Sequence, residues 1–599
     1  MGTAGNVFAG RAENSCAIAS FGRVIANRPH IGDEPSIFVS FGQRFSRGLM
    51  QNQTAKTIKG KAVAALEAGK LQQALKKAQL GLKKFPADTD FHAISGFVLT
   101  ELKQYRKSIP HFVEASKRKP NDPQFAENLA NALMQTGQIP KALEYAEQKL
   151  QKFPNNKELS RVIDEIELKG SNWRAIIDNA TKKLESDPDN ASLLSSRARA
   201  YGRIGFVEEN TRDIARAFEL APDNESIAFQ KAINLHQSGD KETAGEILRK
   251  ITAQNPEHVF SLLQLSTMAN KDSAPDLIEK VETAIANSEH KLSELEFAKA
   301  HLLSKTQGLN AALPQFERAN AIQHETIPYD FAAEEQKFEV ITGQFRENTD
   351  LPFSDISESP VPIFVLGQPR SGTTLMEMML SSAPGVAGCG ELTVAADLSR
   401  DFEQASHAFS SQNASEFAQD FRALMPPIPE GSVAFVDKMP HNFQRIGFLL
   451  AAFPNAKIIN MLRDPRDVGL SKWIRRFPAG GMRYASNQKA IAHTANMYRR
   501  YMTHWNAVFG DRILTVQYEK LVEDPKTYSQ QVAAFCDLEW TETMMHPEEN
   551  TKQVRTASID QVRKKISTKS IGGWRSVSDH LQPMLQGLDP ELWPEYDFD

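Results

Sequence analysis

Six prolines divide one long stretch of the sequence into segments of equal length. They lie 34 residues apart without an insertion or deletion, at Pro86, Pro120, Pro154, Pro188, Pro222 and Pro256. From Met50 onward the sequence reads as one helix after another, and proline is common just after a helix because it cannot continue one. A period of this length indicates a repeated pair of helices that buries its apolar faces only when neighbouring pairs stack. The N-terminal half is therefore predicted to be an all-α solenoid.

The repeated unit resembles the tetratricopeptide repeat, in which two antiparallel helices stack into a right-handed superhelix. Gly96 lies where the two helices of one unit would cross closely. The period weakens after Pro256, but Phe297–Leu303 and Leu313–Ile322 still indicate a helix pair, so we expect about seven to eight units over residues 50–345. Such an array is either a spacer or dimerisation surface, or a groove that binds a peptide or protein. We expect protein binding through the groove.

Composition limits the class of protein. The net charge is -4 and the isoelectric point is near 6.4, which favours neither nucleic acid nor an anionic membrane as a partner. The three cysteines are too few and too scattered for a disulfide framework. The scattered cysteines favour a reducing compartment, so we expect a cytoplasmic protein. The sequence has no apolar run of about 20 residues, which argues against a membrane-spanning helix. Residues 1–49 have no helical period and are expected to be disordered or to precede the native start.

A second feature lies at Val361–Leu375, where an apolar strand, a glycine-containing loop and a helix start follow one another. Gly367 ends the strand, and Ser371–Thr374 offer consecutive N–H groups and hydroxyls at a helix N-terminus, which favours a bound phosphate. The spacing imitates a nucleotide-triphosphate loop, but Thr373 stands where that loop requires lysine. ATP or GTP hydrolysis is therefore disfavoured, while a single terminal phosphate still fits. The alternative is a glycine-rich turn with no ligand.

A second apolar strand, over 458–462, is followed directly by Arg463 and, eight residues later, by Ser471. The serine is thus expected two helical turns into the segment that follows the strand. Arg475 is expected one turn further on the same side. The alternatives are an Arg–Asp corner at a strand end, or a magnesium-binding role for Asp464, which the missing loop lysine argues against.

These motifs together resemble the sulfotransferases that use 3′-phosphoadenosine 5′-phosphosulfate (PAPS), particularly the tyrosylprotein type. The resemblance covers about 240 residues from Pro360 onward, with its pieces in the family's order. It implies an α/β domain over 361–599 with a P-loop-like, mainly parallel sheet, joined to the solenoid by a linker over 346–360. It also implies that the 5′-phosphosulfate lies on Arg370, Ser371, Gly372, Thr373 and Thr374, and the 3′-phosphate on Arg463, Ser471 and Arg475.

The resemblance also assigns roles to residues between and after the two phosphate motifs. Glu391 falls on the family's general base, and Lys438 on a lysine that stabilises negative charge during transfer, a role shared with Arg370. Tyr518, Ser558 and Lys564 correspond to nucleotide contacts, and Ser558 also to a transition-state donor. The family pattern is broken by Leu392 and Thr393 after the base, and by Gly573, which replaces a nucleotide-binding lysine that Lys569 or Arg575 would have to supply.

The expected function is transfer of the sulfuryl group from PAPS to an acceptor hydroxyl, without a metal. A peptide or protein tyrosine, a carbohydrate hydroxyl and a small metabolite all fit as acceptors. The alternative is a helical-repeat scaffold whose nucleotide-binding domain is not catalytic. A nucleotide-triphosphate-dependent kinase is disfavoured by Thr373.

Overall fold

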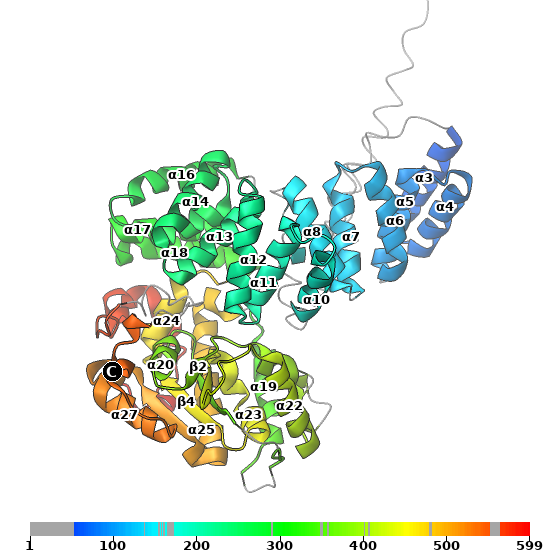
Figure 1. Cartoon of the computed structure of the whole chain (residues 1–599). Coiled ribbons are helices and arrows are strands. Elements are labelled where there is room, and N and C mark those ends of the chain that lie inside the picture. The colour runs from blue at the N-terminus through cyan, green and yellow to red at the C-terminus, as the bar shows by residue number, and fades with distance from the viewer. Residues whose placement is uncertain are drawn as a thin grey trace, which may run out of the picture. The chain divides into compact units, whose positions relative to one another are not determined.

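The computed structural model contains a helical array and an α/β fold (Figure 1). It describes residues 53–102, 104–136, 138–153, 156, 159, 162–163, 173–288, 292–326, 328–347, 351–355, 359–400, 402–404, 408–477, 482–550 and 564–598. The expectation for residues 1–49 therefore lies outside the described part. The chain divides into two compact units, Met1–Ala175 and Ile176–Asp599.

Helix pairs make up the described part of the first unit. The helices are α3 (Gln53–Glu67), α4 (Leu71–Lys84), α5 (Thr89–Glu101), α6 (Tyr105–Arg118), α7 (Pro123–Gln135) and α8 (Ile139–Lys152). Gly96 in α5 meets Phe112 of α6 so closely that an added Cβ would lie 2.8 Å from its ring. A glycine is therefore needed at this crossing, as the sequence predicts.

The second unit also begins with helix pairs, the first helix of which starts just before the boundary. Its helices are α10 (Trp173–Leu184), α11 (Ala191–Arg203), α12 (Val207–Leu220), α13 (Glu225–Ser238), α14 (Lys241–Gln254), α15 (Val259–Met268), α16 (Ala274–Asn287), α17 (Ser293–Thr306) and α18 (Leu309–Thr326). The helix pair expected at Phe297–Leu303 and Leu313–Ile322 is thus α17 and α18. The predicted solenoid is confirmed over the described repeats.

A polar capping residue repeats with the same period as the prolines. The residue two positions after each proline accepts a hydrogen bond from a backbone N–H of the next helical segment; these residues are Asp88, Asp122, Asn156, Asn190, Asn224 and, through Nδ1, His258. Side chains of this kind satisfy N–H groups that the helix itself leaves unpaired. The proline and the cap together explain why each unit begins at a fixed position.

The last repeats share a hydrophobic core with the α/β fold. Phe297 of α17 and Phe316 of α18 belong to the same buried cluster as Phe364 and Phe435 of the sheet. The boundary between the compact units accordingly lies at Ala175, well before the predicted linker at 346–360. The later repeats are part of the body that carries the sheet.

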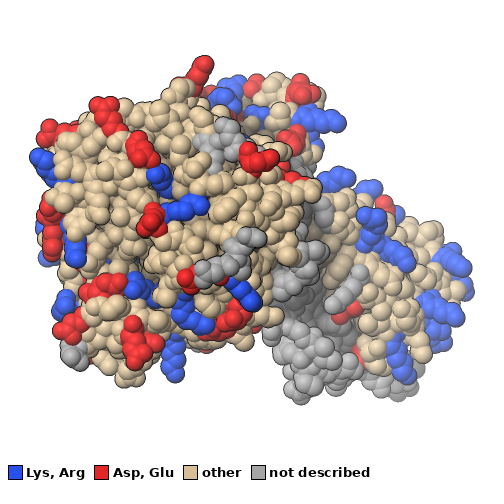
Figure 2. Space-filling model, turned by 90° about the horizontal axis from the view of Figure 1, so that it is seen from below, with Lys and Arg blue, Asp and Glu red and all other residues tan. Residues whose placement is uncertain are grey.

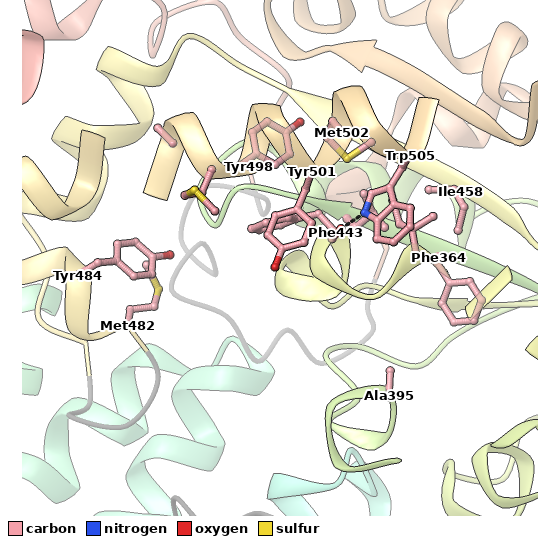
Figure 3. Packing of buried hydrophobic residues seen from close by; sticks show 14 of the residues in the cluster. Phe364, Ala395, Phe443, Ile458, Met482, Tyr484, Tyr498, Tyr501, Met502 and Trp505 are labelled. Carbon is pink, nitrogen blue, oxygen red and sulfur yellow. Dashed lines mark hydrogen bonds between the residues drawn. The ribbon is translucent and has the colours of Figure 1, made fainter. Parts of the chain in front are cut away.

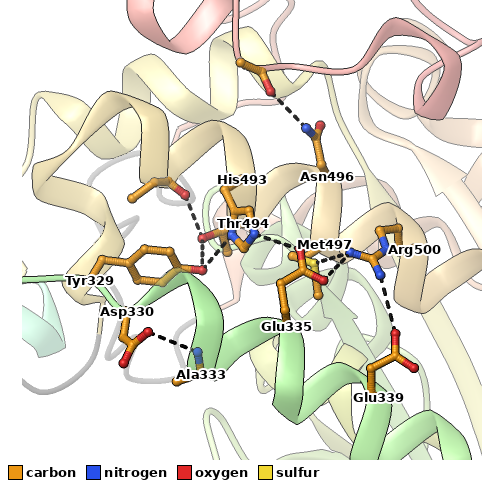
Figure 4. A network of polar contacts seen from close by, with 12 residues as sticks. Tyr329, Asp330, Ala333, Glu335, Glu339, His493, Thr494, Asn496, Met497 and Arg500 are labelled. Carbon is orange, nitrogen blue, oxygen red and sulfur yellow. Dashed lines mark hydrogen bonds and ion pairs between the residues drawn. The ribbon is translucent and has the colours of Figure 1, made fainter.

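A polar network ties the segment after α18 to the long helix α25 (Gln488–Phe509), as Figure 4 shows. Glu335 of α19 (Phe331–Gln344) accepts a hydrogen bond from Arg500 at 2.6 Å and shares one with His493 at 3.0 Å. The hydroxyl of Tyr329 lies 3.0 Å from the other ring nitrogen of His493. Partial burial on its own would raise the pKa of Glu335, but Arg500 and His493 lower it below its usual value.

Within the described residues, the sheet has five parallel strands in the order β2-β3-β1-β4-β5. The strands are β1 (Val361–Gly367), β2 (Val386–Gly388), β3 (Ala434–Asp437), β4 (Lys457–Leu462) and β5 (Ile513–Gln517). The chain runs from β1 to one side and from β4 to the other, so the carboxyl ends of these two neighbours flank the crevice where open α/β sheets bind ligands. The predicted parallel α/β fold is confirmed.

Helices cover both faces of this sheet. Alternate residues of β1 enter two different clusters, Ile363 and Val365 on one face and Phe364 and Leu366 on the other, and all four are fully buried. The first face is covered by α20 (Thr373–Leu380), α26 (Tyr518–Glu523) and α27 (Pro525–Phe535). The second face is covered by α21 (Val394–Ser399), α22 (Ser411–Leu424), α23 (Ile446–Ala452), α25 and the short α29 (Gln582–Leu585).

Aromatic side chains of α25 fill the core on the second face (Figure 3). Tyr498, Tyr501 and Trp505 are at most 1% exposed. The indole N–H of Trp505 donates to the carbonyl of Phe443 at 2.8 Å, which satisfies its one donor. This core fixes the sheet whose strand ends carry the predicted site.

Basic and acidic side chains are interspersed over most of the face drawn in Figure 2. None of the helices in the described ranges has both the length and the apolar character needed to cross a bilayer.

Candidate active site

The five strands deliver the predicted site residues to one edge of the sheet. Glu391 follows β2, Lys438 follows β3, and Arg463 and Tyr518 directly follow β4 and β5. The anion loop, residues 368–372, follows β1 at the centre. Because all five strands are parallel, their carboxyl ends meet at the same edge. The sequence motifs, which span more than a hundred residues, are brought together for this reason.

The backbone of the loop after β1 is held in an unusual shape. Arg370 and Gly372 have φ angles of 79° and 100°, in the left-handed region that favours glycine. A Cβ on Gly372 would lie 2.5 Å from the ring of Tyr518, so glycine is required there by both conformation and space. The N–H of Ser371 donates to the carbonyl of Gln368 at 3.0 Å and closes the turn. Gly372 is the N-cap of α20, which places the loop N–H groups at a helix start.

The side chains around the loop form a cationic cluster. Arg370 Nε donates to Ser471 Oγ at 3.0 Å, and Arg463 donates to the carbonyl of Arg370 at 3.1 Å. The Arg463 guanidinium lies over the Tyr518 ring, 4.3 Å from its centre. Burial, then the charges of Arg475 and Arg463, lower the pKa of Arg370 well below its ordinary value, while Tyr518 and Glu391 act in the opposite direction. An anion in this cluster would relieve that repulsion.

Two polar atoms in the cluster are buried without a hydrogen-bond partner among the described residues, Ser371 Oγ and Arg463 Nε. Buried polar groups without partners are uncommon and costly. One belongs to the loop predicted to hold the 5′-phosphosulfate, and the other to the residue predicted to hold the 3′-phosphate. An anionic ligand would supply the acceptors that these two donors lack.

Beside the loop, a lysine and two glutamates form an ion cluster. Lys438 is fully buried, and its Nζ lies 2.5 Å from Glu391 Oε1 and 3.9 Å from Glu377 Oε2. Glu377 also accepts a hydrogen bond from the N–H of Gly390 at 2.8 Å, which anchors the turn carrying Glu391. Asp437 accepts from the N–H of Leu392 at 3.3 Å, and burial raises its pKa well above the ordinary range. The Glu391 side chain remains 38% exposed and is open to an acceptor.

The segment after β4 differs in part from expectation. The helix α24 (Pro465–Trp473) ends before Arg475, which therefore does not continue the same helical face as predicted. Arg475 still acts on Arg370, and it also lies near His301 of the repeat helix α17, where burial and then this arginine lower the histidine pKa to about 3. Asp464 is engaged by Arg466 through both carboxylate oxygens, each at 2.9 Å, which argues further against a metal role.

The C-terminal candidates are only partly described. Ser558 lies outside the described residues, and Lys564, Lys569 and Arg575 are exposed. Asp467 accepts from the N–H groups of Gly572 and Trp574 at 2.6 and 3.1 Å, which holds the segment around Gly573 against α24. The replacement of the missing lysine by Lys569 or Arg575 stays a prediction.

Two features of this edge have no counterpart in the sequence motifs. The buried Lys472 donates to Gln368 of the loop at 2.7 Å. The turn between α11 and α12 meets the segment around Glu391, since a Cβ on Gly205 would lie 3.2 Å from Leu392 and 3.4 Å from the carbonyl of Cys389. The Lys472–Gln368 contact could have been suspected only because both residues are next to motif residues in the sequence. Nothing in the sequence indicates the contact of the α11–α12 turn.

Comparison with known proteins finds a family model that matches each part of the chain. Residues 362–542 match the model of the sulfotransferase family, and residues 53–162 match a model of the tetratricopeptide repeat. The C-terminal half contains a sulfotransferase domain. Its matched region begins within β1 and includes Arg370, Glu391, Lys438, Arg463 and Tyr518.

One relative matches most of the chain, and others match its C-terminal part. An uncharacterised protein of Aquifex aeolicus is 27% identical over 527 residues, covering 80% of this chain and 68% of that protein. A protein-tyrosine sulfotransferase of Drosophila melanogaster is 27% identical over 276 residues, covering 39% of this chain and 52% of that protein. Protein-tyrosine sulfotransferase 1 of Danio rerio is 27% identical over 263 residues, covering 39% and 70%. This chain thus spans about half the length of the Drosophila relative.

Among solved structures, the sulfotransferase domain of the Synechococcus PCC 7002 olefin synthase aligns with 42% of this chain and 99% of its own length, at 21% identity and a TM-score of 0.29. A tetratricopeptide repeat protein from Parabacteroides merdae aligns with 45% of this chain and 93% of its own, at 14% identity and a TM-score of 0.25.

Proposed function

We propose that this protein transfers the sulfuryl group of PAPS to an acceptor hydroxyl. One observation carries the proposal. The anion loop with its arginines and the carboxylate of Glu391, which is paired with Lys438 and partly exposed, lie at the same edge of the sheet. The sulfotransferase family match and the protein-tyrosine sulfotransferase relatives support the same activity.

Each site residue has a role that depends on its position relative to the nucleotide. Arg370 and the N–H groups of residues 371–374 bind the 5′-phosphosulfate, and Arg463, Ser471 and Arg475 bind the 3′-phosphate. Tyr518 packs beside the nucleotide, with Ser558 and Lys564 as further contacts. PAPS, when bound, supplies the sulfuryl group. Glu391 accepts the proton of the acceptor hydroxyl, while Lys438 and Arg370 stabilise the negative charge that develops during transfer; Ser558 would donate to the same charge.

A protein tyrosine is the acceptor we favour, because the named relatives are protein-tyrosine sulfotransferases. The repeats would bind the acceptor protein. Support comes from the turn between α11 and α12, which lies close to Leu392 and Cys389 and hence to the segment that carries the proposed base. A cytoplasmic location stays a prediction.

Calorimetric titration with the desulfated nucleotide, 3′-phosphoadenosine 5′-phosphate, tests the cofactor. We expect micromolar or tighter binding that Arg463→Ala weakens at least tenfold, because charge-assisted contacts to phosphate are strong, with Arg216→Ala on the exposed face of α12 as the control. Absence of binding, or unchanged binding by Arg463→Ala, would contradict the proposal. Transfer of radioactive sulfate from PAPS to a tyrosine-containing protein then separates an enzyme from a non-catalytic scaffold.

A further inference from the structure

Lys472 lies under the anion loop, yet it belongs to none of the predicted motifs. Its side chain is fully buried in α24, and its Nζ donates to Gln368 Oε1 at 2.7 Å. The amine also lies 5.3 Å from the centre of the Tyr484 ring, whose hydroxyl is hydrogen-bonded to His441. No ion pair joins Lys472 to a carboxylate within the described ranges.

Lys472 and its neighbour Ser471 hold the two sides of the loop. Ser471 accepts from Arg370 at one side, and Lys472 donates to Gln368 at the other. Gln368 is 2% exposed and its carbonyl accepts the N–H of Ser371, so it forms the base of the turn. Arg370 has a φ of 79°, a conformation that a residue with a side chain keeps only when its surroundings hold it.

We propose that Lys472 is a positioning residue which, through Gln368, holds the loop in its anion-binding shape. The inference rests on the proposed function, because it concerns the same nucleotide site. A buried ammonium without a carboxylate partner destabilises a fold, and an apolar side chain of similar size would fill the same space without that cost. A contribution to binding explains why a lysine stands there, since functional sites commonly give up stability to hold a loop in place.

The test uses the full chain and the probe 3′-phosphoadenosine 5′-phosphate. We expect Lys472→Met and Gln368→Met each to raise the dissociation constant about tenfold, the usual size for one lost charge-assisted hydrogen bond. The double variant should bind no more weakly than either single variant, because both remove the same contact. The melting temperature of Lys472→Met, measured without nucleotide, should equal or exceed that of the wild type.

A reversed pair separates positioning from general damage to the fold. Gln368→Lys combined with Lys472→Gln keeps one amine and one amide at the two positions, and it should restore the dissociation constant to within about threefold of the wild type. Lys457→Met is the matched control, because Lys457 begins β4 at the opposite edge of the sheet and pairs with Asp537. It should leave nucleotide binding unchanged.

The inference would be overturned if Lys472→Met bound nucleotide as tightly as the wild type, if the losses of affinity of the two single variants multiplied in the double variant, or if the reversed pair did not restore affinity. Each of these outcomes would leave the proposed function intact. A wild-type protein that binds no nucleotide would overturn the proposed function, and this inference with it.

Discussion

The ammonium of Lys438 lies 2.5 Å from the carboxylate of Glu391, although 47 residues separate them in the sequence. Lys438 directly follows β3 and Glu391 lies three residues after the neighbouring strand β2, so sheet pairing alone brings them together. The pair holds the carboxylate of Glu391 beside the loop that follows β1.

Glu391→Gln should abolish proton acceptance while keeping the size of the side chain. We expect the rate of sulfate transfer to fall by about 10²–10⁴-fold, the usual contribution of a general base, with the dissociation constant of 3′-phosphoadenosine 5′-phosphate changed by less than about twofold. Glu416→Gln on the exposed face of α22 is the control. Transfer at the wild-type rate by Glu391→Gln would exclude this residue as the base.

Gly372→Ala should damage the nucleotide site. The new Cβ would lie 2.5 Å from the Tyr518 ring, and the residue would keep a φ of 100°. We expect a loss of about 2–4 kcal/mol in the free energy of unfolding from strain and overpacking together, and weaker nucleotide binding. Gly431→Ala is matched, because it has a φ of 80° but open space around its Cβ, and should lose only about 1–2 kcal/mol. Equal effects of the two variants would show that contact with Tyr518 is unimportant.

Gly205→Ala tests the contact between the repeats and the segment carrying Glu391. The added methyl would press on Leu392 and Pro426, each 3.2 Å away, and so displace the proposed base by a few tenths of an ångström. We expect the transfer rate to fall about threefold to tenfold, because catalysis depends steeply on position, with unchanged nucleotide affinity. Gly308→Ala, in the α17–α18 turn, has a similar φ and no close neighbour. A matching loss in that control would mean that turn strain alone accounts for the effect.

Stability should depend on pH through Lys472. Burial lowers the pKa of this lysine from 10.5 to about 7. Between these values the unfolded chain binds more protons at this site than the folded protein, so the free energy of unfolding rises with pH, by at most about 1.4 kcal/mol per pH unit. His441, Tyr484 and Gln368 surround the lysine in the wild type and are also present in Lys472→Met. The difference between the two proteins therefore reports on Lys472. The free energy of unfolding, measured with urea from pH 6 to 10, should therefore be larger for Lys472→Met than for the wild type at pH 7. This difference between the two proteins should become smaller toward pH 10. A difference that does not change with pH would contradict the lowered pKa.

Features determined by neighbouring residues could be read from the sequence. The proline period predicts the helix pairs because a helix end depends on residues within about one turn. The run from Val361 to Leu366 predicts a strand buried on both faces, and β1 is one. The polar caps two residues after each proline were available in the same pattern, and they explain the constant phase.

The order of the motifs also predicted that Arg370, Arg463 and Tyr518 share a site, through a family resemblance rather than through geometry. Arg475 was placed on a continued helix because periodicity does not show where α24 ends. Ser558 lies outside the described residues, and its role stays a prediction.

What the sequence by itself determined is therefore local: the repeat unit, the strand and the anion loop. Only the tertiary structure decided that Lys438 pairs with Glu391, that Lys472 supports Gln368 across 104 residues, and that the repeats after Ala175 share a body with the sheet. The physical reason is that these contacts depend on strand order and on packing between elements distant in the chain. A periodic pattern shows which face of an element is buried, but not which neighbour covers it.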